Sequence, residues 1–549
     1  MILSRLLLFL YCLVSDHHLL LSSSFTTASS FPCERIFHGA DAATRCFNAA
    51  ASQDNEAYDL VVVGGGVGGL ATAITVAKDQ QQNTKRILLL ESEPCVGGRV
   101  RSDFTDDGFI LDRGFAVFIE AYPQSQELLD YKALGLNQFL PGARVKLQNR
   151  ETFALVSDPL RRRRDIIKAI TSPVGSLLDK ARLLPLFYTV ITKDIHELFG
   201  DNNNDDGEDK SDMDTLTCLR DTYNFSEEFI SSFFAPFLEG IYLTPLSKQS
   251  SSMFYFVMKM FTVGSASLPV GGMQSVSDQL AQRALDLGVE IKLNSRVLSI
   301  QQQQSQQQSK IVNDVIENEF AIVVANDRKG AEQYHIHAKS VVVATDYNSS
   351  RKLLQDFHGL ESLRSIPKLS QRSVGCIYYA FQSPAPMEEP ILILNGEGYD
   401  RRNTKAFPIN NICFPSIVQK SYSPEGYELC CVSILEGAIA EHDGNESTLD
   451  LEVREQLSMW FPDFANDIRD ETRWVMKGIY VMPNAQPAQF EEEGCANVHG
   501  GRNCSIFQGL TMPSGLFIAG DYMATSSFNG ALESGVNAGD AVNNFFSSS

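Results

Sequence analysis

The sequence predicts an α/β fold joined to a second, α+β domain, and three observations predict it. Residues 60–90 read as strand, glycine turn, helix and strand, which is the unit of a parallel sheet covered by helices. Residues 165–199 have helical periodicity, whereas residues 374–381 and 428–434 alternate as sheet strands do. A chain of 549 residues is long enough for two or three domains.

The first predicted strand is the apolar run 60–63, which ends abruptly in glycine. The glycines that follow fit the G-x-G-x-x-G pattern: one permits the turn, one lets a pyrophosphate approach the backbone, and one lets helix pack on strand. Residues 70–77 continue as a helix whose N-terminus carries partial positive charge. We therefore predict a Rossmann-type dinucleotide site at Gly64, Gly66, Val67, Gly68 and Gly69. A glycine turn without a ligand is the alternative.

The second predicted strand, residues 87–90, ends in an acid. Glu91 lies 22 positions after Gly69 (91 − 69), where a carboxylate is expected to bind a ribose hydroxyl. Strand, glycines, helix, strand and acid in this order are far more specific than the glycine pattern alone.

A second glycine-rich segment favours FAD over a shorter nicotinamide site. Gly97 and Gly98 bring backbone beside the pyrophosphate, and Arg99 can pair with it bidentately. A surface salt bridge is the alternative for Arg99. Gly114 and Phe115 offer a further close approach, suited to the flavin end of a long cofactor.

Near the C-terminus the chain reads Ala519-Gly520-Asp521-Tyr522, followed by Gly530-Ala531 and Ser534-Gly535. With the N-terminal segments, this ending resembles the superfamily of flavin amine oxidases, carotene desaturases and protoporphyrinogen oxidases, over about residues 58–545. The resemblance implies FAD as the cofactor, with Glu91 and the Gly-Gly-Arg segment on its adenosine and pyrophosphate.

The resemblance also implies roles for residues later in the chain. Gly520 and Asp521 would meet the ribityl chain or the pyrophosphate, although Asp521 could instead be a helix N-cap. The helix that follows, with Gly530 and Ala531, would point its N-terminus at the flavin pyrimidine, where it stabilises negative charge. Val297 would touch the adenine.

The same resemblance implies that the two domains alternate along the chain. We expect a Rossmann-type FAD-binding domain of the amine oxidase type, interleaved with an α+β substrate domain. The predicted segments are 1–55 (targeting), 56–140, 280–370 and 491–549 (FAD domain), and 141–279 and 371–490 (substrate domain).

The function implied is hydride transfer from an apolar or amphipathic substrate to flavin N5, with oxygen or a quinone as the final acceptor. A carotenoid or isoprenoid is the favoured substrate. The alternatives are an amine oxidase or protoporphyrinogen oxidase-like enzyme, a non-redox polyene isomerase or hydratase, and a flavin-bearing binding protein. Tyr480 and Tyr522 are the candidate catalytic residues. True amine oxidases usually carry a lysine bound through water to flavin N5, and no lysine of this sequence can be assigned that role.

Composition excludes some partners. The net charge of −21 argues against nucleic acid and against electrostatic attachment to anionic lipid, while peripheral contact with a membrane is left open. Histidines and cysteines do not cluster in the sequence, so we predict no metal site. The acidic tract 201–214 and the glutamine run 301–308 are predicted to be insertions without a catalytic role. The arginine run 161–164 could contact phosphate, acidic lipid or a carboxylate, but is more typical of a solvated helix start.

The N-terminus is predicted to be a targeting segment. Residues 1–5 supply a positive start through Arg5, and residues 6–14 form an apolar stretch of signal-peptide length. Ala28-Ser29-Ser30-Phe31-Pro32 resembles the signal-peptide junction of plastid precursors in diatoms and related algae. We therefore predict import into a plastid by a signal plus a transit peptide, with the secretory pathway as the alternative, since four N-x-[ST] sequons are present.

Overall fold

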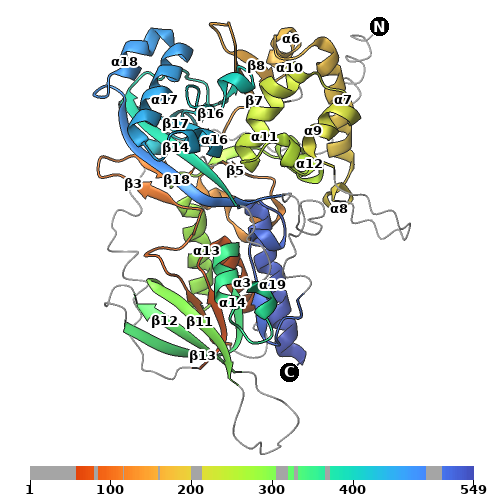
Figure 1. Cartoon of the computed structure of the whole chain (residues 1–549), viewed down its shortest axis with the longest axis vertical. Coiled ribbons are helices and arrows are strands. Elements are labelled where there is room, and N and C mark those ends of the chain that lie inside the picture. Colours follow the sequence, from red (N-terminus) through yellow and green to blue (C-terminus); the bar gives the residue numbers. More distant parts are fainter. Residues whose placement is uncertain are drawn as a thin grey trace, which may run out of the picture.

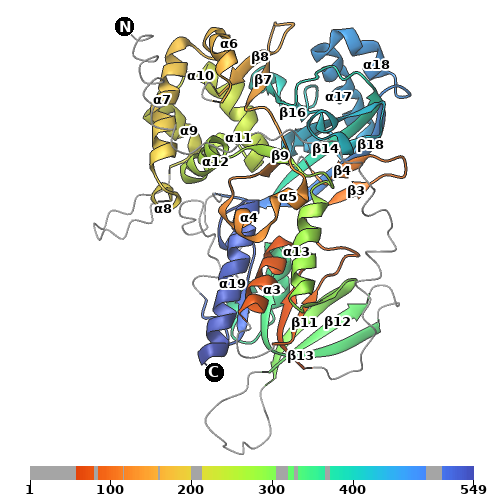
Figure 2. The same ribbon diagram turned by 180° about the vertical axis from the view of Figure 1, so that it is seen from behind.

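The computed structural model describes residues 57–79, 85–114, 117–158, 161–199, 213–303, 319–326, 332–364, 371–489 and 510–548. The predicted targeting segment, Phe115, most of the acidic tract and residues 304–308 of the glutamine run lie outside these ranges. Within them the chain forms a dinucleotide-binding body below and a two-part body above (Figures 1 and 2).

The lower body is built on a seven-stranded sheet assembled from distant segments. Four of its strand pairs are parallel, and two antiparallel pairs form a meander on one side of the sheet. The order is β10 (Glu290–Lys292), β2 (Ile87–Leu90), β1 (Ala57–Val63), β13 (Glu332–Val343), β12 (Glu319–Asn326) and β11 (Ser295–Gln303), with β19 (Leu516–Ile518) also on β13.

Strand β1 explains why the predicted pattern holds. Its last four residues pair with β2 on one side and β13 on the other. Leu60 and Val62 pack into the core on one face of the sheet and Val61 and Val63 into the core on the other, so the strand needs apolar side chains on both faces. Strand β13 returns the chain beside β1. Helices α3 (Val67–Lys78), α13 (Gln274–Asp286), α14 (Tyr347–Leu354) and α19 (Phe528–Ser548) flank the sheet.

The upper body contains a second seven-stranded sheet, which confirms the strands predicted at 374–381 and 428–434. Its order is β18 (Val475–Pro487), β14 (Gln371–Gln382), β17 (Tyr427–Leu435), β16 (Ile409–Cys413), β15 (Leu392–Gly396), β7 (Gly142–Leu147) and β8 (Ala154–Ser157). Helices α15 (Pro415–Val418), α16 (Glu436–Glu441), α17 (Glu446–Trp460) and α18 (Ala465–Arg469) accompany it. Trp460 and Trp474 are fully buried in its core.

Beside this sheet lies a helical block, drawn in yellow and orange in Figure 1. It comprises α6 (Ile166–Thr171), α7 (Leu177–Thr192), α8 (Ile195–Leu198), α9 (Thr215–Thr217), α10 (Glu227–Phe229), α11 (Ala235–Tyr242) and α12 (Ser251–Val263). The periodic stretch 165–199 thus forms three helices, because Ser176 begins α7 with a capping box to Asp179.

No helix of the described residues is long and apolar enough to cross a membrane.

Short elements join the two bodies. They are β3 (Ser102–Phe104), β4 (Ile110–Asp112), β5 (Phe118–Ile119), β6 (Asn137–Gln138), β9 (Ala266–Leu268), α4 (Pro123–Leu128) and α5 (Tyr131–Leu134). Asp112 ties them together: its carboxylate accepts hydrogen bonds from Ser102 Oγ at 2.6 Å, Met273 N at 2.9 Å and the Tyr422 hydroxyl at 2.8 Å.

The buried Asp112 predicts an unusual pH dependence. Burial raises its pKa from 3.8 to about 6. Because the folded carboxyl binds its proton more tightly than the unfolded one, its contribution to stability is fully present below about pH 4 and declines as pH rises to about 6. Relative to Asp112→Asn, we expect the free energy of unfolding to fall by roughly 3 kcal/mol across this window. Urea unfolding at pH 4–7 measures it; a difference independent of pH would contradict the prediction.

Candidate cofactor and substrate site

The glycine turn between β1 and α3 has the geometry that the sequence predicts. A Cβ at Gly64, whose φ is +112°, would lie 2.7 Å from the carbonyl oxygen of Ala344, and a Cβ at Gly69 would overlap the carbonyl oxygen of Gly64. At Gly66 a Cβ would meet nothing within 4 Å. The first and third glycines are therefore required by the protein's own packing, whereas Gly66 faces open space at the N-terminus of α3.

The other residues of the turn serve helix packing and the neighbouring loop. Val67 is buried at the start of α3. A Cβ at Gly68 would stand 3.0 Å from the carbonyl oxygen of Ala531 in α19, so Gly68 lets the two helices approach. Gly97 donates its N–H to the carbonyl oxygen of Gly65 at 2.8 Å, which lays the second glycine segment against the turn. Gly97 and Gly98 both have positive φ, +116° and +59°.

Glu91 lies at the end of β2, beside the turn, and is buried. Its Oε2 accepts the N–H of Gly65 at 2.7 Å and its Oε1 accepts the N–H of Glu93 at 2.8 Å. Oε1 also accepts a hydrogen bond from the Ser92 hydroxyl at 3.2 Å, so the second lone pair of Oε2 is the acceptor left for a ribose hydroxyl.

This geometry predicts the effect of a single-atom change. Glu91→Gln would place an amide N–H against one of the two backbone N–H donors, at Gly65 or Glu93. We expect the variant to lose about 1–3 kcal/mol of unfolding free energy even without cofactor. Urea unfolding of the flavin-free protein measures it, and Glu93→Gln, whose side chain is half-exposed, is the matched control. Equal stability of Glu91→Gln and Glu93→Gln would show that Glu91 does not stabilise the turn.

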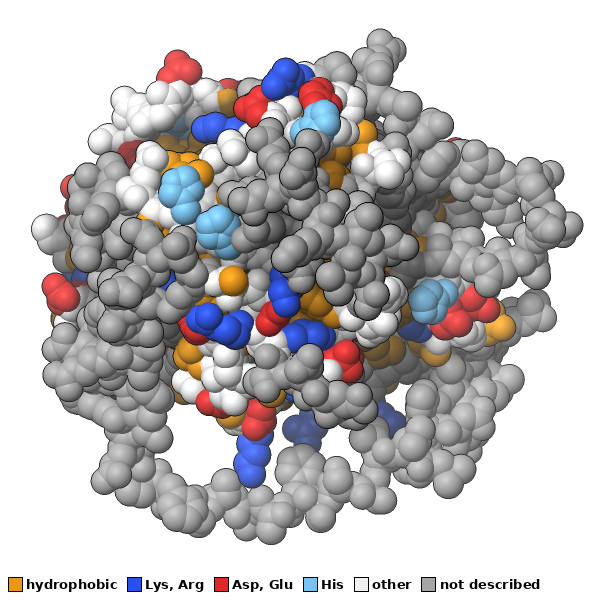
Figure 3. All heavy atoms as spheres, turned by 90° about the horizontal axis from the view of Figure 1, so that it is seen from below, with side chains coloured by type: hydrophobic (Ala, Val, Ile, Leu, Met, Phe, Trp, Pro, Cys, Tyr) orange, Lys and Arg blue, Asp and Glu red, His pale blue; other side chains and the backbone are white. Residues whose placement is uncertain are grey.

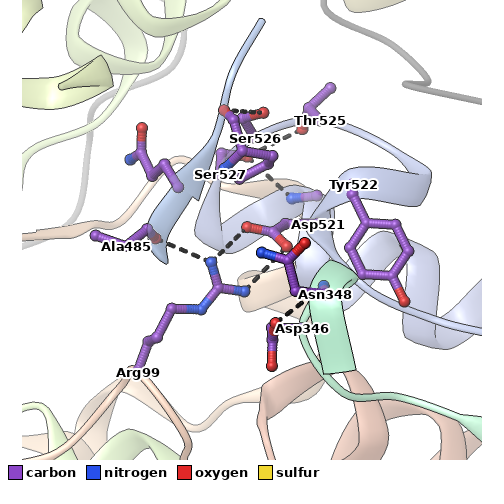
Figure 4. A network of polar contacts seen from close by, with 12 residues as sticks. Arg99, Asp346, Asn348, Ala485, Asp521, Tyr522, Thr525, Ser526 and Ser527 are labelled. Atoms are coloured by element: carbon purple, nitrogen blue, oxygen red, sulfur yellow. Dashed lines mark hydrogen bonds and ion pairs between the residues drawn. The ribbon is translucent and has the colours of Figure 1, made fainter. Parts of the chain in front are cut away.

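Arg99 joins the first and last FAD segments (Figure 4). Its guanidinium donates to both oxygens of Asp521, at 2.7 and 2.9 Å, and to the carbonyl oxygen of Ala485 at 2.9 Å. The negative charge of Asp521 raises the pKa of Arg99. The pair is bidentate, and its acceptor is a carboxylate of this chain, whereas the sequence predicts that Arg99 pairs with the pyrophosphate of the cofactor. Asp521 thus positions Arg99 beside the glycine segments.

Helix α19 begins next to this pair. Ser527 caps it: its hydroxyl accepts the N–H of Gly530 at 3.0 Å, and its carbonyl oxygen accepts the N–H of Ala531 at 3.0 Å. The N-cap is therefore Ser527 and not Asp521. A Cβ at Gly530 would overlap the carbonyl oxygen of Thr525, and one at Gly520 would overlap the Tyr522 ring.

Two further predicted cofactor contacts lie on the described chain. Gly114 has φ +100°, a Cβ there would meet nothing within 4 Å, and the residue lines the cavity described below. Val297 lies at a β-bulge of β11 and packs half-buried against the sheet core.

Neither candidate catalytic tyrosine, Tyr480 or Tyr522, lines the cavity that is described below. Tyr522 is buried, with its hydroxyl 2.7 Å from Ser350 Oγ and its ring against Tyr347. Tyr480 lies on β18, edge-on to Tyr378. Burial raises the pKa of both candidate phenols, which keeps them protonated near neutral pH.

A cavity of about 640 Å³ runs from the FAD segments into the helical block. Its inner end is lined by Arg99, Gly114, Ala485, Ser527 and Phe528, and its outer end by residues of α6 and α7. Between them stand aromatic and Met side chains that the sequence marks as dense apolar runs: Phe229, Phe233, Phe237, Met258 and Phe261. The middle of the cavity is thus apolar, and its inner end is continuous with the predicted cofactor site.

The charged residues that line the cavity are mostly cationic. They are Arg99, Arg113, Arg161, Lys180 and one acid, Asp158. Lys180 is the one lysine among the described lining residues, and it donates to the carbonyl oxygens of Ile170 and Ser172, near the outer end. No described group of three or more His, Cys, Asp or Glu side chains could hold a metal ion.

Sequence reasoning did not find Ala485 or Ser527. Ala485 contributes its carbonyl oxygen, so its side chain carries no pattern of its own. A serine three residues before a glycine at the start of a predicted helix is the signal that could have revealed Ser527.

Comparison with known proteins identifies the family of this chain. Residues 67–543 match the family described as flavin containing amine oxidoreductase, and the chain belongs to that family. The residues fit FAD, since the space before Gly66, the buried Glu91 and the N-termini of α3 and α19 lie where its phosphates, ribose and flavin need them. The protein is an FAD-dependent oxidoreductase.

The individual proteins that resemble this chain are only distantly similar to it in sequence. A 15-cis-phytoene desaturase of Solanum lycopersicum is 31% identical over 130 residues, which is 24% of this chain and 21% of that protein. The chain therefore matches about a fifth of its length. Two solved structures share the fold: one assigned as a protoporphyrinogen oxidase from Exiguobacterium sp. 255-15 (TM-score 0.58, 16% identity, 88% and 98% of the two chains) and a cyclohexylamine oxidase from Brevibacterium oxydans (0.58, 13%, 90% and 100%).

Proposed function

We propose that this enzyme oxidises an apolar or amphipathic substrate, with a carotenoid or isoprenoid as the favoured class. The observation that carries the proposal is the apolar cavity of about 640 Å³ that leads from the cofactor segments through the aromatic wall of the helical block. When bound, FAD supplies the two-electron acceptor for a substrate C–H bond, and oxygen or a quinone would take the electrons onward.

The protein's own contribution would be to orient the substrate and to exclude water. Phe233 and Phe237 stack at 6.0 Å between centroids on one wall and present ring faces along the path of a long chain. No described side chain that lines the cavity pairs a nucleophile with a base, so the described residues hold the substrate and do not attack it.

The charges of the cavity weigh against an amine substrate. Asp158 is the one acid among the described lining residues and it pairs with Arg161 at 3.7 Å, so a protonated amine would find no unpaired carboxylate there. An amphipathic substrate with an anionic end, of which a porphyrinogen is one class, is the second candidate that these charges favour. The similarity to phytoene desaturases supports a polyene as the substrate.

The test is anaerobic mixing of the FAD-loaded enzyme with a panel of carotenoids, isoprenoids, porphyrinogens and amines. We expect the flavin absorption to bleach with a polyene or isoprenoid, and product analysis to show a new double bond. Bleaching by amines alone would overturn the proposal. A flavin that stays oxidised with every compound, while a polyene is isomerised or merely bound, would move the assignment to a non-redox role.

A further inference from the structure

One amide side chain on the cavity wall has an unused hydrogen-bond acceptor. Asn411 of β16 lines the cavity and is 3% exposed, yet its Oδ1 accepts no hydrogen bond from any residue that the structure describes. Ser433, its partner on β17, does not donate to it, since Ser433 Oγ also lacks a partner among those residues. A buried polar atom without a partner costs the full free energy of its desolvation, so such an atom in a cavity wall points to a ligand that supplies the donor.

A bulge in β16 turns Asn411 toward the C-terminal part of α11. The pairing of β16 with β17 shifts register just before Asn411, and a bulge of this kind re-aims the neighbouring side chains. A Cβ at Gly240 would lie 2.7 Å from Asn411 Nδ2 and 2.8 Å from Asn410 Nδ2, so both amides face this glycine. Asn410 is paired at both ends of its amide: its Oδ1 accepts from Arg402 at 2.8 Å, and its Nδ2 donates to the carbonyl oxygen of Pro236 at 3.0 Å. Of the two asparagines, only Asn411 keeps an acceptor for a ligand.

A second amide with an unused acceptor stands beside the same part of α11. Gln486 of β18 lines the cavity and donates from Nε2 to the carbonyl oxygen of Ile241 at 2.8 Å. That bond fixes which end of the amide faces α11, and Oε1 is buried without a partner among the described residues. Because Gly240 and Ile241 are consecutive, the two amides flank one short stretch of the cavity wall. Ala485, next to Gln486, accepts from Arg99, so this stretch lies toward the cofactor segments.

The charges at this stretch favour a neutral hydrogen-bond donor. Basic and acidic side chains are interspersed on the lower face of the molecule (Figure 3), whereas the carboxylate next to Gly240 is buried and compensated. It belongs to Glu239, which pairs with the buried Arg402 at 2.7 Å. A protonated amine would therefore find no unpaired carboxylate at these residues, and an anionic group would face two carbonyl oxygens. A hydroxyl group is neutral and donates a hydrogen bond, so it meets both requirements.

We propose that Asn411 and Gln486 form a polar subsite that accepts a hydrogen bond from a hydroxyl group of the substrate. Aromatic rings line the middle of the cavity, so the preferred molecule is an isoprenoid or polyene alcohol and not the corresponding hydrocarbon. The hydrogen bond sets how far the chain reaches along the cavity, and thus which C–H bond stands nearest the flavin. This deepens the proposed function and rests on it in one respect: the substrate occupies this cavity.

The experiment measures dissociation constants by equilibrium dialysis of the FAD-loaded enzyme, with its flavin reduced and air excluded. A reduced flavin accepts no hydride, so binding is measured without turnover. The probes are geranylgeraniol and its methyl ether, which has the same chain and the same oxygen but no O–H donor. We expect the native enzyme to bind the alcohol at least about tenfold more tightly than the ether, because the ether leaves both carbonyl oxygens unpaired.

Asn411→Leu removes one acceptor with little change of volume, and it should reduce the preference for the alcohol to below about threefold. Because Oδ1 is unpaired in the ligand-free protein, the midpoint of urea unfolding should equal or exceed that of the native chain. Gln486→Met should also reduce the preference, but it should lower the midpoint because it loses the bond to Ile241.

Ser157→Ala is the matched control. Its Oγ is also buried, unpaired among the described residues and on the cavity wall, but β8 lies three strands away from β16 in the sheet. The Ser157→Ala enzyme should keep the full preference of the native enzyme for the alcohol.

Equal binding of alcohol and ether by the native enzyme would overturn the proposal, as would no binding of either probe or an undiminished preference in Asn411→Leu. A loss of preference in Ser157→Ala as large as in Asn411→Leu would overturn it too, because the hydroxyl would then bind elsewhere in the cavity. A lowered urea midpoint in Asn411→Leu, with both probes bound more weakly, would show that Asn411 supports the fold. The binding ratios do not depend on flavin bleaching, so failure of the proposed function and failure of the subsite are distinguishable.

Discussion

We expect the Gly66→Trp protein to fold and to bind FAD at least 100-fold more weakly than the native chain. A side chain at residue 66 meets no protein atom within 4 Å at its Cβ, and the backbone there has φ −69° and ψ 173°, which any residue adopts. The substitution therefore costs the protein little, and its bulk occupies the space where the pyrophosphate would approach α3. A 100-fold loss corresponds to about 2.7 kcal/mol.

The measurement is flavin titration of the deflavinated protein, with urea unfolding beside it. Gly69→Ala is the informative contrast, because its Cβ would overlap the carbonyl oxygen of Gly64 and should destabilise the fold itself. Equal FAD affinity in Gly66→Trp and the native chain would refute the placement of the cofactor at this turn. A loss of folding in both variants would show that Gly66 serves packing.

Much of the cofactor site could be predicted from the sequence because it is local. Strand, glycines and helix follow one another between residues 57 and 78, so that backbone periodicity and steric need determine them. The acid after β2 follows from the same unit, since β1 and β2 pair in parallel and end at the same edge of the sheet.

What the sequence could not predict depends on distant contacts. Arg99 and Asp521 are 422 positions apart, and only the folded chain shows that they pair with each other. Tyr522 stands in the motif that suggests a flavin contact, yet its hydroxyl reaches Ser350 on α14. The first break of the periodic stretch 165–199 does have a sequence signal, Pro173 and Gly175 before the capping box of Ser176 and Asp179, but helical periodicity alone does not register it.

The cavity is the clearest case of a feature without a sequence signature. Its wall combines residues of β7, α6, α7, α11, α12 and the start of α19, none of which is adjacent in the chain to the glycine turn. Dense runs of Phe and Met are usually core, and here Phe234 and Phe254 are buried while Phe233 and Phe261 line the cavity. Which side of a helix faces empty space follows from tertiary packing alone.

The position of α6 beside the cavity predicts that a bulky side chain there hinders long substrates. Ala169 lies on α6 and lines the outer end, so we expect Ala169→Trp to narrow the entrance without disturbing the cofactor. For a long apolar substrate, kcat/KM should fall at least 30-fold, since forcing extra bulk into a packed site costs roughly 2 kcal/mol. A short analogue that stays near the inner end should be affected less than threefold.

The matched control is Ala133→Trp on the exposed face of α5, which should leave kcat/KM and flavin content unchanged. Flavin content and photoreduction of the bound flavin report on the inner end and should be the same in all three proteins. If Ala169→Trp lowers kcat/KM equally for long and short substrates, the effect is not one of access. If Ala169→Trp lowers kcat/KM for neither substrate, substrates do not travel between α6 and α7. The route from the outer end of the cavity to the flavin is then wrong.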